Sequence, residues 1–206
     1  MGGEGAARRD NAALVAWMRR LAGTIREHEA ELTGLDAAIG DGDHGANLAR
    51  GFNKVEQKLE AEAPGTPAAL FRLVGMTLIG TVGGASGPLY GTFFLEAGKA
   101  AGAEAELDAA ALARCLAAGL AGVRMRGKAE AGEKTMVDAL TPAIEVLGRG
   151  GSLAEASAAA RAGAEATAPL IARKGRASYL GERAIGHVDP GAASSALLIG
   201  SLAEAG

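Results

Sequence analysis

The chain has 206 residues, of which 49% are hydrophobic, so one large or two small domains with a sizeable core are expected. The 21 basic and 24 acidic residues give a formal net charge of −3, which argues against an electrostatic nucleic-acid binder. The single cysteine, Cys115, excludes an internal disulfide framework and a cysteine metal site. Because no uncharged apolar run reaches about 18 residues and no secretory signal opens the chain, we expect a cytoplasmic protein without a membrane span.

Helical periodicity recurs along the whole chain. Leu14, Trp17, Met18, Leu21 and Ile25 repeat at intervals of three and four residues, the stripe of an amphipathic helix. Only 3% of the residues are aromatic, so the core must be built mainly from Ala, Leu, Val and Ile, of which Ala and Leu favour helix. The predicted helices, in chain order, are 10–31, 44–60, 66–81, 88–101, 108–126, 135–149, 152–172 and 191–204. No run combines β-branched residues with strict alternation, so we predict an all-α single domain, 1–206, without strands.

Three breaks between the predicted helices differ from plain turns. Segments 35–47, 82–92 and 173–191 concentrate Asp, Gly, Ser, Arg and His. Loops with such chemistry usually carry function, because a rigid scaffold can aim their side chains. Antiparallel helices bring alternate connections to the same end, so we expect all three segments to meet at one rim, together with 126–135.

The first of these breaks contains Asp36, Asp41 and Asp43. On one helix a step of five residues would point two side chains roughly 140° apart, whereas Gly40 and Gly42 favour a loop on which the three carboxylates can converge. Converging carboxylates repel each other unless a cation lies between them. Mg²⁺ typically combines carboxylates with substrate phosphates and waters. The segment therefore predicts a magnesium site, and the free N–H groups of the next helix could receive a phosphate.

Other interpretations of the same segment were weighed. Residues 40–45 match G-x-G-x-x-G, but a dinucleotide fold needs a preceding strand and a parallel sheet, and neither is predicted. An EF-hand starting at Asp41 fails because its sixth position is Ala46 and its twelfth is Phe52. A third interpretation stays open: a simple turn in which Asp43 caps the helix and the other aspartates are solvated.

Two polar residues that follow the aspartates allow two roles each. His44 could be a general base or a ligand, but a histidine beside a helix cap more often makes local hydrogen bonds, and we favour a main-chain role for this position. Asn47, on the first turn, could donate to a phosphate or be a polar surface residue, and we favour the first.

The second break, 82–92, places Gly83, Gly84, Ser86 and Gly87 before a helix. Glycines let a backbone approach a ligand closely, and successive N–H groups can form an anion nest. A Gly-rich turn serves helix packing equally well. No Walker A motif is present, because no Gly-Lys pair is followed by Ser or Thr.

The two remaining segments are basic. In 126–136, Lys128 and Lys134 could meet phosphates or be solvated, and Met136 could cover an adenine face or only pack. The segment 173–192 is long for an idle connection, and its cations suit phosphates, with arginine giving bidentate contacts. These cations are Arg173, Lys174, Arg176 and Arg183. A solvated basic loop is the alternative.

Taken together, these segments resemble the L subunit of bacterial dihydroxyacetone kinases and the nucleotide domain of the single-chain ATP-dependent kinases. The matching strings are LTGLDAAIGDGDHGANLARGF (32–52), GMTLIGTVGGASGPLYGTFF (75–94), RGKAEAGEKTMVDAL (126–140) and RKGRASYLGERAIGHVDPGAASS (173–195). They occur in the family's order and cover well over a third of the chain. The length of the chain favours the separate subunit, and residues 1–9, which match nothing in the family, are expected to be frayed.

The resemblance implies an eight-helix antiparallel up-and-down barrel and a site for ADP/ATP with two Mg²⁺ ions. Asp36, Asp41 and Asp43 match the family's magnesium ligands. The positions that match its nucleotide contacts run from the helix start to the last break: His44, Gly45, Asn47, Ala85, Ser86, Gly127, Met136, Arg176, Asp189, Pro190 and Gly191. No residue is expected to be a catalytic nucleophile, and Arg176 is the candidate charge stabiliser, because phosphoryl transfer needs positioning and charge neutralisation.

The resemblance also implies partners. In the family variant served by the phosphotransferase system, bound ADP is rephosphorylated in place by a phosphoryl-donor M subunit. The ATP then phosphorylates dihydroxyacetone held by a histidine of a separate K subunit. A homodimer is a further expectation. The near alternative is a kinase subunit that uses exchangeable ATP on dihydroxyacetone or another short ketose, and a non-catalytic nucleotide sensor is a more distant one.

Overall fold

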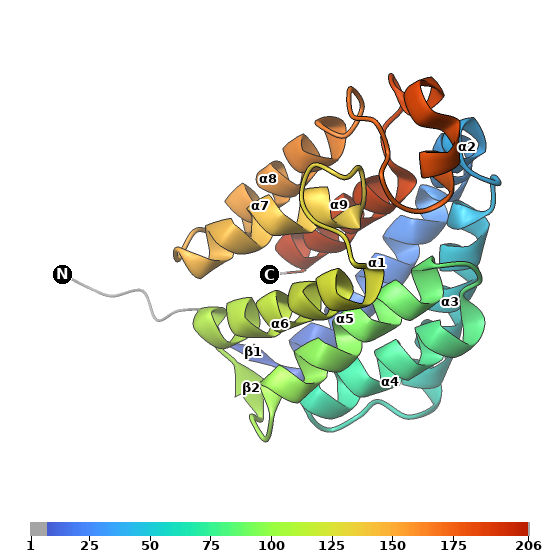
Figure 1. Cartoon of the computed structure of the whole chain (residues 1–206). Coiled ribbons are helices and arrows are strands. Elements are labelled where there is room, and N and C mark those ends of the chain that lie inside the picture. Colours follow the sequence, from blue (N-terminus) through green and yellow to red (C-terminus); the bar gives the residue numbers. More distant parts are fainter. Residues whose placement is uncertain (1–7, 206) are drawn as a thin grey trace.

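The computed structural model describes residues 8–205, and within them the chain is predominantly helical and forms a single domain (Figure 1). The α-helices are α1 Asn11–Glu27, α2 Glu29–Ile39, α3 His44–Ala61, α4 Pro67–Thr81, α5 Ser86–Ala101, α6 Ala109–Gly127, α7 Met136–Gly148, α8 Leu153–Glu165 and α9 Pro190–Glu204. A 3₁₀ helix, η1, covers Arg176–Ala184, and two short strands are β1 Arg9–Asp10 and β2 Glu106–Leu107. The all-α class predicted from the periodicity is confirmed. In this described part no helix is long and apolar enough to cross a lipid bilayer.

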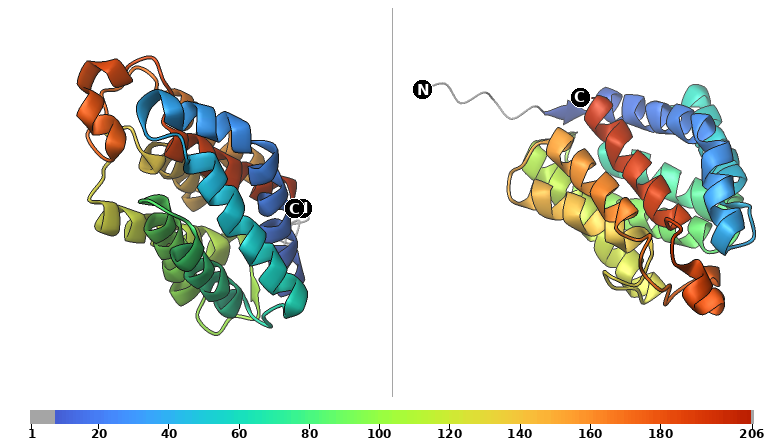
Figure 2. Two further views of the ribbon diagram at one scale, coloured as in Figure 1. Left: turned by 90° about the vertical axis from the view of Figure 1, so that its right-hand side faces the viewer. Right: turned by 90° about the horizontal axis from the view of Figure 1, so that it is seen from above.

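The long helices pack mainly against their neighbours along the chain. Helix α3 contacts α1 and α4, α5 contacts α4 and α6, α7 contacts α6 and α8, and α9 contacts both α8 and α1. Two further views show these helices side by side, with the short η1 segment projecting at one end (Figure 2). Helix α2 packs on α3 and on η1, at that same end. The packing places the connections after α2, α4 and α6 near the long connection that contains η1.

The core is mainly aliphatic and contains a group of packed aromatic rings. Trp17, Phe71 and Phe94 are buried, with ring centroids 6.1–6.2 Å apart. The indole Nε1–H of Trp17 donates to the Ser201 hydroxyl at 3.1 Å, so the one polar atom of the ring is satisfied inside the core. This contact joins the first and last helices.

Two predicted helix boundaries were wrong in ways that matter for the site. The predicted helix 10–31 is interrupted at His28, and α2 then continues to Ile39, so Asp36 lies on the last helical turn and not in a loop. The predicted helix 152–172 ends at Glu165. Beyond it, Pro169 cannot continue the helical hydrogen bonding, and the carbonyls of Thr167 and Ala168 accept hydrogen bonds from a buried lysine, described below.

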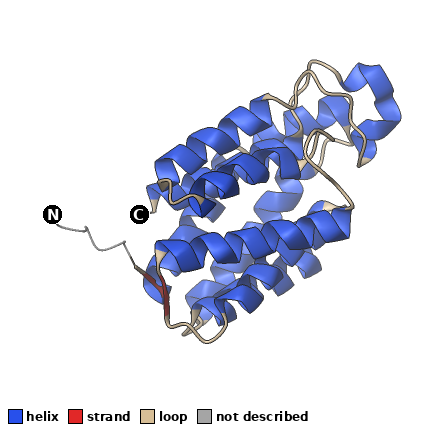
Figure 3. Ribbon diagram, turned by 60° about the vertical axis from the view of Figure 1, so that its left-hand side comes forward, coloured by secondary structure: helices blue, strands red, loops and turns tan. Residues whose placement is uncertain are grey.

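The prediction of no strands was also wrong. Strands β1 and β2 pair antiparallel, Arg9 opposite Leu107 and Asp10 opposite Glu106 (Figure 3). Two residues are too few for an alternating pattern to show in the sequence. Residues 1–7 of the segment expected to be frayed lie outside the described residues, whereas Arg9 is ordered in β1 and buried.

Candidate functional site

The four loop segments singled out in the sequence meet at one end of the helices, as predicted. They surround a cavity of about 370 Å³. The first residues of four helices line it, namely those of α3, α5, α7 and α9, and α2 and α6 end there. The N-terminus of a helix carries free N–H groups and a partial positive charge. This end of the molecule is therefore suited to an anion.

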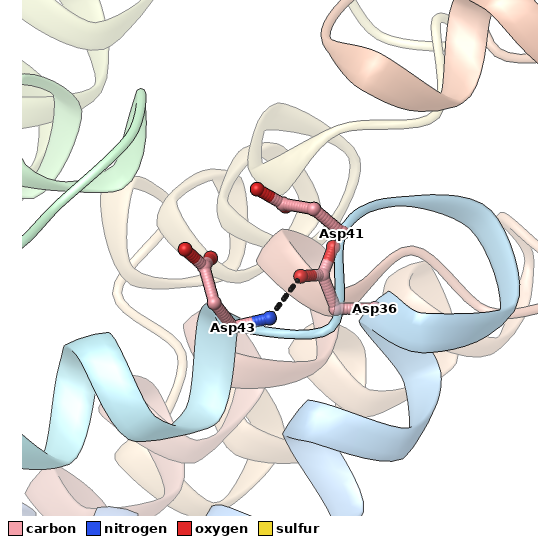
Figure 4. A group of neighbouring side chains, drawn as sticks. All are labelled: Asp36, Asp41 and Asp43. Carbon is pink, nitrogen blue, oxygen red and sulfur yellow. Dashed lines mark hydrogen bonds between the residues drawn. The ribbon is translucent and has the colours of Figure 1, made fainter.

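Three carboxylates stand at the edge of this cavity. Asp36 comes from the last turn of α2, and Asp41 and Asp43 come from the short connection to α3. One ligand atom from each lies within 4.8 Å of the others, with Asp36 buried and the other two exposed (Figure 4). The convergence of the three aspartates predicted from the sequence is thus present, although one of them comes from a helix.

Two glycines permit the turn that brings the aspartates together. A Cβ at Gly40 would lie 2.1 Å from Oδ1 of Asp36, so a side chain there would displace this carboxylate, and Gly42 has φ +74°. The turn is held by Asp36, whose Oδ2 accepts the backbone N–H of Asp43 at 2.9 Å and of His44 at 3.2 Å.

The simple-turn interpretation in which Asp43 caps α3 was wrong. Asp43 occupies the N-cap position, but its side chain makes no capping hydrogen bond, because Asp36 supplies the acceptor instead. The carboxylate of Asp43 is therefore left for another partner. Asp41 is paired with Nη2 of Arg176 at 2.9 Å, the one ion pair that the three aspartates make within residues 8–205.

The donor set fits a hard divalent cation. Three carboxylates against a single guanidinium leave an excess of negative charge within a few ångströms, and such a cluster is stable when a cation lies between its oxygens. Oxygen ligands from carboxylates, completed by phosphate and water, are what Mg²⁺ prefers. The exposed positions of Asp41 and Asp43 leave room for these further ligands.

His44 links three helices through its ring. Nδ1 is 3.0 Å from the hydroxyl of Ser86 on α5, and Nε2 is 2.8 Å from the hydroxyl of Ser194 on α9. Burial lowers the pKa of His44 below its usual value, so the neutral ring is favoured. Ser194 is in turn 2.7 Å from the hydroxyl of Tyr90, which also contacts Ser195. This network fixes the start of α3 relative to the glycine-rich turn before α5.

The other side of the cavity is apolar. Met136, at the start of α7, is buried and lines it, together with Leu89 and Val123. Gly127, the last residue of α6, lies close to this wall, since a Cβ there would lie 3.3 Å from the end of the Leu89 side chain. An acidic and glycine-rich wall facing an apolar wall matches a ligand with a charged end and a flat apolar end.

Lys134 is a structural cation. Its side chain is 1% exposed, and Nζ donates to the carbonyls of Thr167 at 2.7 Å, Ala168 at 3.3 Å and His187. Burial lowers its pKa. The ammonium thereby connects the start of α7 to both ends of the long connection that carries Arg176. Its three donors bind protein carbonyls and not a phosphate.

Asp189 is the N-cap residue of the last helix, α9. Its carboxylate accepts the N–H of Ala192 at 2.7 Å, and its own N–H donates to Thr167. Burial raises its pKa to about 7, against the opposing effects of these helix N–H groups and of Lys134. Pro190 and Gly191 follow it and also line the cavity.

Two predicted nucleotide contacts do not line the cavity. Gly45 packs against α2, where a Cβ would lie 2.1 Å from the carbonyl of Glu29. Asn47 is buried, and its side-chain oxygen accepts a hydrogen bond from Arg50. All other predicted metal and nucleotide positions line the cavity. The Ser194–Tyr90 pair was missed, and so were Leu89 and Val123 of the apolar wall, because a serine in an Ala-rich helix and an aliphatic residue in a core stripe carry no local signal of a site.

A helical domain that combines converging carboxylates with several helix N-termini is typical of metal-assisted binding of a phosphorylated ligand. The chain belongs to the DAK2 domain family, which matches residues 38–204. It is 45% identical over 188 residues to the "PEP-dependent dihydroxyacetone kinase 1, ADP-binding subunit DhaL" of Listeria innocua, covering 91% of this chain and 93% of that one. The corresponding ADP-binding subunit of Escherichia coli is 45% identical over 200 residues, 93% and 95% of the two chains.

A solved structure extends the comparison to three dimensions. The dihydroxyacetone kinase of Citrobacter freundii in complex with AMP-PNP and Mg²⁺ superposes with a TM-score of 0.78 and 31% sequence identity. The match covers all of this chain and 36% of the kinase chain.

Proposed function

We propose that this chain is the ADP/ATP-binding subunit of a dihydroxyacetone kinase, in which bound nucleotide relays a phosphoryl group from a phosphotransferase-system donor to dihydroxyacetone. The observation that carries the proposal is the approach of Asp36, Asp41 and Asp43 within 4.8 Å of one another, beside a cavity ringed by helix N-termini. The identity of 45% to ADP-binding subunits over nearly their whole length supports the same assignment.

In this proposal each wall of the cavity has one task. Asp36, Asp41 and Asp43 hold two Mg²⁺ ions, which neutralise the phosphate oxygens when bound. The N–H groups of Ala85 and Ser86 receive the phosphates, and the helix start at His44 is positioned beside them. Met136, Leu89 and Gly127 accommodate the adenine against the apolar wall, and the residues from Asp189 to Gly191 close the site at α9.

In this proposal Arg176 has two alternative partners, Asp41 and the transferred phosphoryl group. Its side chain is 67% exposed and is paired with Asp41, and the preceding Gly175 has φ +65°. With a cation held by Asp41, the guanidinium of Arg176 would no longer be needed as its partner and could face the transferred phosphoryl group. Positive charge placed there stabilises the loose transition state of phosphoryl transfer. No nucleophile from this chain is required.

The remaining parts of the proposal concern the assembly. The ketone is held by a histidine of a separate K subunit, and an M subunit supplies the phosphoryl group in the cytoplasm. A homodimer and an eight-helix antiparallel barrel, with α2 as an addition to it, complete the proposal. The ring of contacts from α1 through α3 to α9 supports the barrel.

Calorimetric titration with ADP, with and without Mg²⁺, tests the shared premise. We expect tight binding only with Mg²⁺, and transfer from phosphoenolpyruvate to dihydroxyacetone only when K, M and the general phosphotransferase proteins are added. Tight ADP binding in the presence of EDTA would contradict the role of the aspartates.

A second candidate is a kinase subunit that uses exchangeable ATP on dihydroxyacetone or another short ketose. The fold match to a kinase solved with AMP-PNP and Mg²⁺ supports this second candidate. Retention of ADP through prolonged dialysis supports the relay, whereas rapid loss of ADP and turnover with free ATP support the second candidate.

A further inference from the structure

A second cavity lies at the opposite ends of α6 and α7 from the aspartates. It measures about 670 Å³ and is formed where β1, the start of α6, the end of α7 and the start of α8 come together. Helix α6 lines both cavities with different residues, this one with Ala109 to Ala117 and the first one with Val123 to Gly127. Figure 1 shows β1 and β2 at that end of the molecule, away from η1.

Arg9 is the unusual residue of this cavity. It is 8% exposed and lines the cavity from strand β1, yet its guanidinium makes no hydrogen bond or ion pair with any residue of the described part of the chain. Burial lowers its pKa, and no neighbouring carboxylate opposes that effect. The next residue back, Arg8, is different, because it is exposed and paired with Glu106. Because this guanidinium lines the cavity without a protein partner in the described residues, an anion there would gain a charge-assisted contact.

The cavity offers further groups that favour an anion. The first residues of α6, Ala109 and Ala110, line it, and within residues 8–205 their N–H groups have no hydrogen-bond acceptor. The Asp108 carboxylate is engaged by the N–H of Ala111 at 2.7 Å. Arg114, one turn further along α6, is exposed at the cavity and has no ion pair in the described part of the chain. Helix α8 also starts here, at Leu153.

We propose that this second cavity is an oxyanion-binding site, in which Arg9 binds a phosphate or carboxylate group that also accepts hydrogen bonds from the first N–H groups of α6. Arg114 adds charge at the mouth. The volume exceeds that of an oxyanion alone, and Leu112, Ile144 and Leu147 line the rest, so the ligand class is a small organic acid or phosphate ester with an apolar body. Because Arg9 belongs to β1, occupation fastens this strand to the starts of α6 and α8.

Titration of ¹⁵N-labelled protein with inorganic phosphate, and separately with butyrate, tests the proposal by amide chemical shifts. We expect the Ala109 and Ala110 signals to move and saturate with one of the two anions, independently of signals near the aspartates. Loss of a charge-assisted contact should weaken the response in Arg9→Gln by about tenfold or more. Arg9→Lys should keep part of it. Arg8→Gln, on the same strand, is the matched control and should bind as the wild type does.

Arg114→Gln covers the possibility that Arg9→Gln does not fold, since Arg114 is exposed. It should weaken the anion by several-fold while the remaining spectrum is unchanged. Shifts at Ala109 and Ala110 that fail to saturate with either anion would overturn the proposal, as would equal affinity in the wild type and in the Arg9→Gln or Arg114→Gln proteins.

Discussion

Replacing Asp43 by Asn should change stability and ligand binding in opposite directions. The two side chains have the same shape, and Asp43 makes no capping hydrogen bond that the exchange could remove. Asp36 holds the turn through the N–H groups of Asp43 and His44, and these donors are unaffected. We therefore expect the Asp43→Asn protein to be more stable than the wild type without metal, and to lose Mg²⁺-dependent ADP binding.

The size of the stabilisation follows from the spacing of the charges. Two unit charges 4.8 Å apart repel by about 1 kcal/mol in a water-like medium and by about 3 kcal/mol at an effective dielectric constant of about 20. Asp41 and Asp43 are exposed, and Arg176 offsets part of the charge, so the lower value applies. A gain of about 1 kcal/mol raises the Tm of a chain of this size by about 2–4 °C.

Thermal unfolding in EDTA and calorimetry with Mg²⁺ and ADP measure the two effects on the same samples. Glu60→Gln is the matched control, since Glu60 is exposed near the far end of α3 and its loss removes one charge without touching the cluster. A lower Tm of Asp43→Asn in EDTA would refute the electrostatic reasoning. Unchanged ADP affinity in the presence of Mg²⁺ would refute the ligand role.

Three further substitutions probe the scaffold of the site. Lys134→Met leaves the carbonyls of Thr167, Ala168 and His187 without their donor, and the first of these contacts is buried, so urea unfolding should show a loss of about 2–3 kcal/mol. A loss below about 0.5 kcal/mol, on the order of a surface change, would contradict the structural role. Tyr90→Phe should lower the unfolding free energy by about 1 kcal/mol through its lost contacts to Ser194 and Ser195, and equal stability by the same measurement would exclude them. Because burial raises the pKa of Asp189 from 3.8 to about 7, the folded state binds that proton more tightly than the unfolded state. Its stabilising contribution is present below about pH 4 and is lost as the pH rises through about 7. Relative to Asp189→Asn, which keeps a capping side chain, the wild type should lose stability over that range in urea titrations, and parallel pH profiles would contradict the shift.

The elements that set the site were predictable where the sequence signal was local. The aspartate spacing predicted a cation cluster, because two glycines beside three acidic residues favour a turn whatever the rest of the chain does. The periodic stripe of Leu14 and Trp17 predicted α1 for the same reason. The breaks rich in Gly, Asp and Arg predicted the rim, because antiparallel helices place alternate connections together.

Features that depend on contacts far apart in the sequence were not predictable. Whether Lys134 faces a phosphate or three carbonyls is decided by residues 167 to 187, which approach it only in the folded chain. The strand pair of Arg9 and Leu107 joins residues 98 positions apart. Nothing in the sequence around His44 indicates that two distant serines, Ser86 and Ser194, contact its ring.

The cavity combines a positive and a negative electrostatic feature, and each of them repels one of the two proposed ligands. The starts of α3, α5, α7 and α9, with Arg176, favour an anion, while the three aspartates repel it. Magnesium alone is attracted by the aspartates but repelled by the positive helix ends. ADP alone is attracted by the helix ends but repelled by the aspartates. Bound together they cancel both repulsions. Magnesium must therefore raise the affinity for ADP by the same factor by which ADP raises the affinity for magnesium.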